Sequence, residues 1–106
     1  MSVYVIVDAV NLDEERALEY RRLAESTIEQ YDGRYRIQGA KPEPAEGVWP
    51  EGRIMTVVEF PDMARAKRWY FSDEYEKAKR ARDGAIDVRL LFVEGGKAAW
   101  PGQTPA

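Results

Sequence analysis

Residues 53–60 read RIMTVVEF, a run of mostly apolar and β-branched side chains. Such side chains favour a strand. Pro61 follows the run, and proline cannot donate a hydrogen bond to a sheet ladder. The stretch therefore predicts a β-strand that ends at Phe60.

Both faces of this strand are apolar. Successive side chains along a strand point to opposite faces of its sheet. One face receives Ile54, Thr56, Val58 and Phe60, and the other receives Met55 and Val57. A second run, residues 3–10, repeats the pattern with Val3, Val5 and Val7 opposite Tyr4, Ile6 and Val10. The sheet built from these strands needs a cover on both sides.

Two stretches of the sequence have helical periodicity. The first spans Asp13 to Tyr31, with Asp13 as its expected N-cap. Gly33 follows, and we expect this glycine to end the helix in a left-handed conformation. The second begins at Asp62 and contains a new helix start at Ser72, so we expect a kinked or split helix.

Two further strands complete the pattern. Residues 34–39 alternate polar and apolar side chains, and residues 86–93 again have strand character. Residues 40–52 are rich in proline and glycine and predict a long loop. The order β-α-β-β-α-β is that of a ferredoxin-like α+β sandwich, with four antiparallel strands and both helices on one face. We place a single domain at residues 1–95 and a C-terminal tail at residues 96–106.

Helices on one face leave the other face of the sheet without a cover. An exposed apolar patch of this kind is typical of an interaction surface. We therefore expect the chain to form a homodimer through that face. The alternative is a monomer whose second face is closed by the proline-rich loop and by Trp100 in the tail. A structureless cover leaves backbone groups hard to satisfy, so the homodimer is favoured.

The charge balance limits the classes of partner that the sequence predicts. The chain has 106 residues, and its 16 basic and 19 acidic side chains give a net charge of −3. That balance provides no positive field to attract a phosphate backbone, so we expect no nucleic-acid partner. The N-terminal run is apolar for only a few residues before Asp8, which argues against a membrane span. We expect a cytoplasmic protein with no membrane partner.

The sequence contains neither cysteine nor histidine. Their absence excludes disulfides, thiolate nucleophiles, imidazole bases and metal sites built from either residue. A haem iron would need a tyrosine ligand. We expect no cofactor and no metal.

Residues around the second helical stretch carry a family resemblance: Glu59-Phe60-Pro61, Ala66, Trp69-Tyr70, Ser72, Glu74-Tyr75 and Arg82. Further matches are Tyr31-Asp32-Gly33-Arg34, Glu46-Gly47, Trp49 and Arg53. On these residues the chain resembles a bacterial family catalogued as domain of unknown function 1330. The resemblance implies a dimeric α/β barrel, in which two ferredoxin-like sheets face each other. The wider superfamily includes cofactor-free monooxygenases, lactone isomerases and haem-handling enzymes, but a shared fold does not fix an activity.

Five side chains are candidates for a ligand pocket: Tyr20, Glu59, Trp69, Tyr75 and Arg82. Glu59 and Arg82 together would hold an anionic ligand or tune a carboxylate base, or else form a structural ion pair between helix and sheet. The aromatic side chains would orient a flat small molecule, or else belong to ordinary core packing. Ala17 stands where the family pattern leads us to expect an aromatic residue, a change that would enlarge or reshape a nearby pocket.

Two more features have alternative interpretations. Asp8 interrupts an apolar strand, where it is either a base with a raised pKa or a strand-end carboxylate near water or an arginine. The proline-rich loop around Trp49 is a lid, a swapped arm or a plain surface loop.

Together these observations predict a homodimeric protein that binds a small molecule, either as a simple binder or as a cofactor-free enzyme of monooxygenase or isomerase type. The alternative is a non-catalytic dimer that acts as a structural or interaction module. A cavity lined by inward-pointing polar groups favours the first function, and a solid core favours the second.

Overall fold

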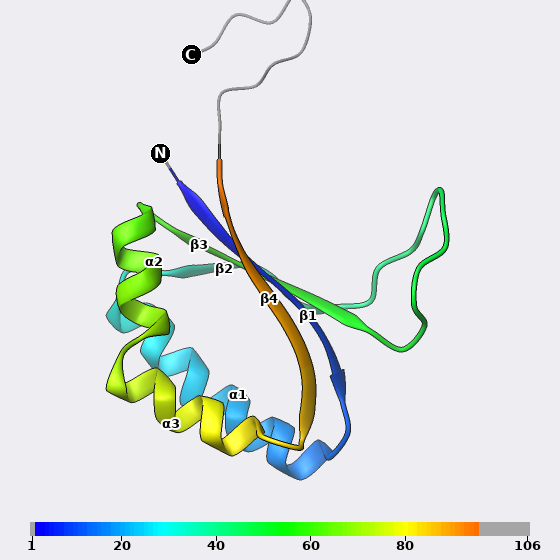
Figure 1. The fold of residues 1–106 in the computed structure, drawn as a ribbon, viewed down its shortest axis with the longest axis horizontal. Coiled ribbons are helices and arrows are strands. Elements are labelled where there is room, and N and C mark those ends of the chain that lie inside the picture. Colours follow the sequence, from blue (N-terminus) through cyan, green and yellow to red (C-terminus); the bar gives the residue numbers. More distant parts are fainter. Residues whose placement is uncertain (1, 96–106) are drawn as a thin grey trace, which may run out of the picture.

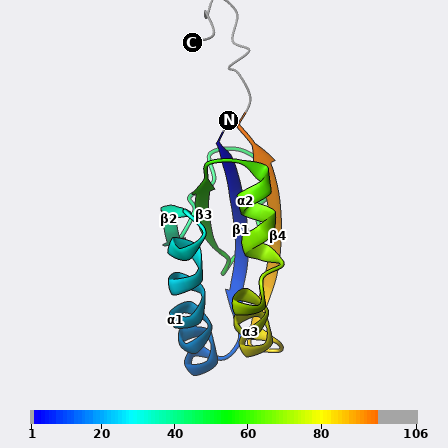
Figure 2. The same cartoon turned by 90° about the vertical axis from the view of Figure 1, so that its left-hand side faces the viewer.

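The computed structural model describes residues 2–95 of the 106-residue chain. Its strands are β1 (Val3–Asn11), β2 (Arg34–Ala40), β3 (Ile54–Phe60) and β4 (Ile86–Glu94). Its helices are α1 (Glu14–Gln30), α2 (Met63–Tyr70) and α3 (Asp73–Arg82). The strands form one antiparallel sheet in the order β2-β3-β1-β4, and the three helices lie on one side of it (Figure 1 and Figure 2). The predicted ferredoxin-like α+β sandwich is confirmed, whereas the expectations for Trp100 and the tail lie outside the described residues.

Side-chain caps explain where each helix begins. Asp13, Asp62 and Ser72 precede α1, α2 and α3, and each accepts a hydrogen bond from a backbone N–H three residues later, at 3.2, 2.8 and 3.1 Å. These bonds satisfy amide groups that have no partner inside the helix. The expected split of the second helical stretch is confirmed, because α2 ends at its C-cap Phe71 and Ser72 starts α3.

The end of α1 differs from the prediction. Asp32, and not Gly33, adopts the left-handed conformation, with a φ of 66°. The Asp32 N–H donates to the carbonyl of Glu29 at 3.0 Å and the Gly33 N–H to that of Ile28 at 2.8 Å, which is a Schellman motif. Glycine at position 33 serves packing instead, since a Cβ there would lie 2.8 Å from ring carbons of Phe60 and from Ile28 Cγ2.

The core lies between the helices and the sheet. Its largest fully buried side chains are Trp69, Tyr75, Phe60, Val3, Val5 and Val58. The Trp69 ring lies with its centroid 4.2 Å from that of Tyr75 and 5.3 Å from that of Phe60. Its indole N–H donates to Thr27 Oγ1 at 3.0 Å. The bulkiest core side chain therefore has its polar atom satisfied, which links α2 to α1.

The opposite face of the sheet, which we call the open face, carries no helix from residues 2–95 (Figure 1). Ile6 in β1 lies opposite Val57 in β3 and Leu91 in β4. The apolar side chains of this face are Tyr4, Ile6, Val10, Ile37, Met55, Val57, Leu91 and Val93. Leu91 is 53% exposed and Ile37 is 41% exposed. The expectation that the sheet is apolar on both faces is confirmed.

A β-bulge in β2 redirects one side chain. Tyr35 pairs with Val58, whereas Ile37 pairs with the adjacent residue Val57, with an irregular register between them. An extra residue in one strand moves the following side chain to the other face. Tyr35 therefore faces the helices and Ile37 faces the open side, although simple alternation places both on one face.

The proline-rich loop, residues 41–53, connects β2 to β3 and extends away from the helices (Figure 1). Residues 41–52 are exposed, and Val48 is fully so. The Trp49 indole N–H donates to the carbonyl of Glu46 at 3.0 Å, a contact within the loop itself. The loop therefore does not provide the cover for the open face that a monomer would need.

We expect Asp32→Gly to raise the free energy of unfolding and Gly33→Ala to lower it. Glycine accepts the left-handed backbone without the steric cost of a side chain, worth about 1 kcal/mol. A methyl group at position 33 overpacks the contact with Phe60, at a cost of about 1–3 kcal/mol. Urea denaturation of the two variants measures both effects. A neutral Gly33→Ala would contradict the packing explanation.

Candidate ligand cleft

A cleft of about 340 Å³ lies between α1 and the helix-facing side of the sheet. Its apolar walls are Val7, Ala9, Ala17, Ala24, Ile28, Ile54, Val58, Ile86 and Val88. Its polar or amphipathic lining consists of Asn11, Tyr20, Arg21, Glu25, Tyr35, Gln38, Thr56 and Trp69. A small concave space with apolar walls and a few polar groups is the usual form of a small-molecule site.

Two tyrosines and an arginine form a hydrogen-bonded cluster beside this cleft. The Tyr20 and Tyr75 hydroxyl oxygens are 2.7 Å apart. Arg82 Nη1 donates to the Tyr75 hydroxyl at 2.9 Å and to the Tyr20 hydroxyl at 3.5 Å. The three side chains come from α1 and α3, so the cluster ties the two helices together.

Burial fixes the charge of this cluster. Burial of Tyr75, together with the nearby Tyr20, raises the pKa of the Tyr75 hydroxyl far above its ordinary value. Tyr75 is therefore a neutral phenol at physiological pH. Arg82 remains protonated, as guanidinium groups in proteins do. The cluster thus places the positive charge of Arg82 against the neutral hydroxyl of Tyr75 and the hydroxyl of Tyr20.

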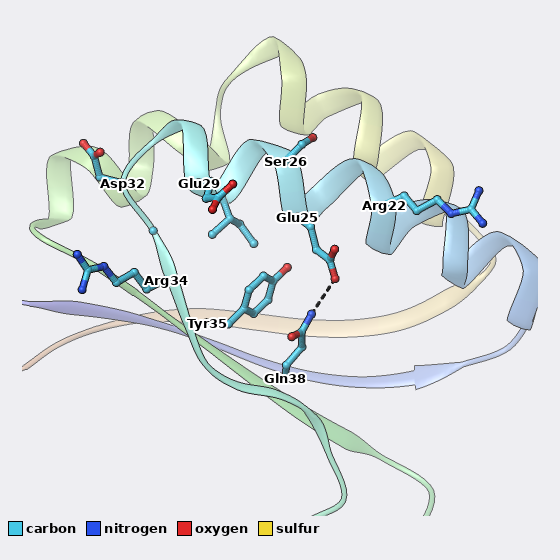
Figure 3. Close-up of a pocket in the computed structure, with 10 residues that line it drawn as sticks. Arg22, Glu25, Ser26, Glu29, Asp32, Arg34, Tyr35 and Gln38 are labelled. Atoms are coloured by element: carbon cyan, nitrogen blue, oxygen red, sulfur yellow. Dashed lines mark hydrogen bonds between the residues drawn. The ribbon is translucent and has the colours of Figure 1, made fainter.

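An open groove of about 810 Å³ between α1 and β2 adjoins the cleft (Figure 3). Glu25, Tyr35 and Gln38 line both spaces. Figure 3 shows Tyr35 pointing from β2 toward α1, and Gln38 Nε2 donating to Glu25 Oε1 at 2.8 Å. Burial raises the pKa of Tyr35, so its hydroxyl stays neutral as well. These side chains lie at the boundary between the cleft and the groove.

The structure brings four of the five predicted pocket candidates together. Tyr20 and Trp69 line the cleft, and Tyr75 and Arg82 contact Tyr20 behind it. Trp69 and Tyr75 are also buried core residues. The core-packing interpretation therefore holds for these two side chains, of which Trp69 also lines the cleft.

Glu59 does not join this group, and the predicted Glu59–Arg82 pair is wrong. Val58 and Phe60 are buried beneath the helices, so Glu59 between them points to the open face. Its carboxylate accepts a hydrogen bond from Arg36 Nε at 2.6 Å. Glu59 therefore forms its ion pair within the sheet, between β3 and β2.

The sequence analysis missed Tyr35, Glu25 and Gln38. The bulge that turns Tyr35 inward has no signal in the residue pattern, because Tyr35 and Ile37 fit simple alternation. The Glu25–Gln38 contact joins α1 to β2 only after the helix packs on the sheet.

Asp8 is paired with arginines on the open face. Arg53 Nε donates to one carboxylate oxygen at 2.6 Å, and Arg89 Nε donates to the other at 3.0 Å. Partial burial favours a higher pKa for Asp8, but the hydrogen bonds from Arg89 and Arg53 outweigh it and lower the pKa. Asp8 is thus the carboxylate near arginines, and the hypothesis of a base with a raised pKa is wrong.

Within residues 2–95, no three or more acidic side chains are grouped so that they could bind a metal ion. In the same part of the chain, every helix is too short or too polar to span a bilayer.

The sequence matches the family described as "Domain of unknown function (DUF1330)" over residues 2–96. The chain belongs to this family. The resemblance drawn from the residues around α2 and α3 is thereby confirmed. A comparison with functionally curated proteins finds no match for this DUF1330 chain.

Solved structures share the fold at low sequence identity. A protein of unknown function from Rhodopseudomonas palustris is 20% identical, with 92% of this chain and 85% of that chain covered and a TM-score of 0.71. A dimeric ferredoxin-like protein of unknown function from Jannaschia sp. is 11% identical, with coverages of 90% and 100% and a TM-score of 0.70. SnoaB, a cofactor-independent oxygenase from Streptomyces nogalater, is 8% identical, with coverages of 92% and 96% and a TM-score of 0.57. At these identities the likeness establishes the ferredoxin-like fold.

The pairing of Asp8 predicts a pH-dependent stability. The folded-state pKa of Asp8 lies below its ordinary value of 3.8, so the stabilisation is present above pH 3.8 and is lost as the pH falls through the folded value. Asp8→Asn should lower the free energy of unfolding at pH 6 by about 1–2 kcal/mol and by less at pH 3. Urea denaturation at both pH values and one protein concentration measures the difference. Glu43→Gln in the exposed loop is the control, and a loss for Asp8→Asn that is equal at both pH values would contradict the assignment.

Proposed function

We propose that this DUF1330 protein is a homodimer that binds a small molecule in the cleft between α1 and the sheet. The observation that carries the proposal is the cleft itself, about 340 Å³ in volume, with apolar walls and the Tyr20 hydroxyl held at one side by Tyr75 and Arg82. Its volume is within the range of small-molecule sites, which is about 300–1,000 Å³.

The small side chain of Ala17 supports the proposal that the cleft has room for a ligand. It lines the cleft from α1 and is only 3% exposed. A larger side chain at this position would project from α1 into the same volume. The small residue thus keeps open a cavity that an aromatic residue would fill in part.

The open face supports the homodimer. Its apolar side chains come from all four strands, and they form a layer that water contacts in a single chain. A second copy that stacks sheet on sheet would bury both faces at once. The neighbour from Jannaschia sp. is described as dimeric and has the same fold.

The cleft is also compatible with cofactor-free catalysis. SnoaB, which has the same fold, is described as a cofactor-independent oxygenase. In this chain, the side chains available for such chemistry are the hydroxyls of Tyr20 and Tyr35 and the carboxylate of Glu25. A binder that performs no reaction would use the same cleft.

One observation favours the alternative of an interaction module. Val48 and Trp49 are apolar side chains that the loop presents to solvent, and such residues often mark contact surfaces. Removal of these two side chains would impair such a module but would leave the cleft intact.

The homodimer is tested by Leu91→Glu. A carboxylate on the open face would be buried without a partner in a sheet-to-sheet interface, at a cost of several kcal/mol. We expect sedimentation at micromolar concentration to show a dimer for the wild type and a monomer for the variant. Leu18→Glu, at a residue of α1 that is 46% exposed, is the control and should remain dimeric. A monomeric wild-type protein would refute the homodimer.

The ligand is tested by a thermal-shift screen of a metabolite library on the wild type and on Ala17→Phe. A compound that binds only the native state raises its Tm, by about 5 °C or more for strong ligands at saturation. The phenyl ring fills part of the cleft, so such shifts should largely disappear in Ala17→Phe. Leu18→Phe adds the same ring to the outside of α1 and should keep them. Shifts that persist in Ala17→Phe would place binding outside the cleft.

A further inference from the structure

Arg82 lacks the carboxylate partner that Arg36 and Arg53 have. Arg36 pairs with Glu59, and Arg53 pairs with Asp8, both at 2.6 Å. Within residues 2–95, Arg82 has no carboxylate in an ion pair and donates only to the hydroxyls of tyrosines. Arg82 therefore forms no ion pair with an acidic side chain in the described part of the chain.

The environment of Arg82 strengthens this contrast. The side chain is half-buried, and its guanidinium carbon lies 5.4 Å from the ring centroid of Tyr20 and 5.7 Å from that of Tyr75. Removing a charged group from water is costly unless an opposite charge or strong hydrogen bonds replace the water. Neutral hydroxyls do so only in part, which leaves a preference for an anion at this position.

The cleft and the hollow that contains Arg82 have two lining residues in common. Ile86 and Val88 line the cleft, and they also line an open hollow of about 500 Å³ that contains Arg82. Tyr20 reaches the cluster from the cleft side, and Arg82 reaches it from the hollow. Tyr20 therefore connects the two spaces, because it lines the cleft and its hydroxyl contacts Arg82, which lines the hollow and not the cleft.

The hollow also contains other charges. Lys79, Arg80, Asp83 and Asp87 line it together with Arg82. Lys79 is engaged by Glu76 at 2.8 Å, and Asp87 is engaged by Arg53 at 3.1 Å. Lys79 and Asp87 thus have ion-pair partners, whereas Arg80, Arg82 and Asp83 have none among the described residues.

We propose that the ligand of the cleft is a carboxylate with a flat, apolar body, and that Arg82 and the Tyr20 hydroxyl recognise its carboxylate group. The inference rests on the proposed function, since it specifies the ligand of the same cleft. A guanidinium presents donors in a planar fork that matches a carboxylate, and the apolar walls suit the remainder of the molecule. Tyr75 is a positioning residue, because its buried hydroxyl holds both Arg82 and Tyr20 in place.

The test compares a charged probe with a neutral one of the same shape. Isothermal titration calorimetry measures the Kd of 2-naphthoate and of 2-naphthamide for the full-length wild-type protein. We expect 2-naphthoate to bind about 10- to 100-fold more tightly, which is the range for hydrogen bonds to charged groups. In Arg82→Met the two probes should differ by less than about twofold, and Tyr20→Phe should reduce the preference in part.

Matched variants distinguish specific recognition by Arg82 from a general attraction of anions to positive charge on the helix. Arg80 lies on the same helix and lines the same hollow but is exposed, so Arg80→Met should change the preference by less than about twofold. Arg82→Lys retains the charge without the fork and should keep part of the preference. If Arg82→Met does not fold, as judged by circular dichroism, Tyr20→Phe and Arg82→Lys still provide the test.

The failures of the two proposals are distinguishable. Equal affinities of 2-naphthoate and 2-naphthamide for the wild type would overturn the inference about Arg82, while the cleft would remain a small-molecule site. The same holds if Arg80→Met abolishes the preference as fully as Arg82→Met does. Absence of binding by both probes would also overturn the inference, and the proposed function would fail with it only if the library screen gave no compound sensitive to Ala17→Phe.

Discussion

The sheet is apolar on both faces, and this constraint governs the rest of the structure. All three helices pack on the face that carries Val3, Val5, Val58 and Phe60, and they bury it. The part of the chain that the structure describes supplies no helix for the face that carries Ile6, Val57 and Leu91. The sheet therefore separates two surfaces: a helix-covered side that contains the cleft, and an open side with exposed apolar side chains. The ligand site and the dimer interface that we propose would lie on opposite sides of the sheet.

Among the described residues, buried polar side chains are few, and none of their buried nitrogen or oxygen atoms lacks a hydrogen-bond partner. Thr27 satisfies the Trp69 indole, and the Tyr75 hydroxyl meets Tyr20 and Arg82. Such pairing follows from the cost of an unsatisfied polar atom in a dry core. Arg82 has hydrogen bonds to both tyrosines but no ion pair with an acidic side chain among the described residues. Its guanidinium is the point of contact that we propose for an anionic ligand.

Particular residues show which features of the fold and the site the sequence pattern could predict. The caps Asp13, Asp62 and Ser72 could be predicted because a cap depends only on residues within one helical turn. Strand alternation predicted the two faces, and applied consistently it would also have placed Glu59 on the open side. The bulge that separates Tyr35 from Ile37 could not be predicted, since it arises from pairing between β2 and β3.

The sequence by itself determined the order of the elements, the faces of the central strands and membership of the DUF1330 family, because each of these depends on local residue types and their spacing. Only the tertiary structure decided which residues meet at the cleft. Tyr20 and Arg82 are separated by 62 positions in the chain, and their contact exists because α1 and α3 pack side by side on the sheet. The spacing of residues along the sequence does not predict such a contact. The contact is set by the packing of whole helices and not by any local propensity.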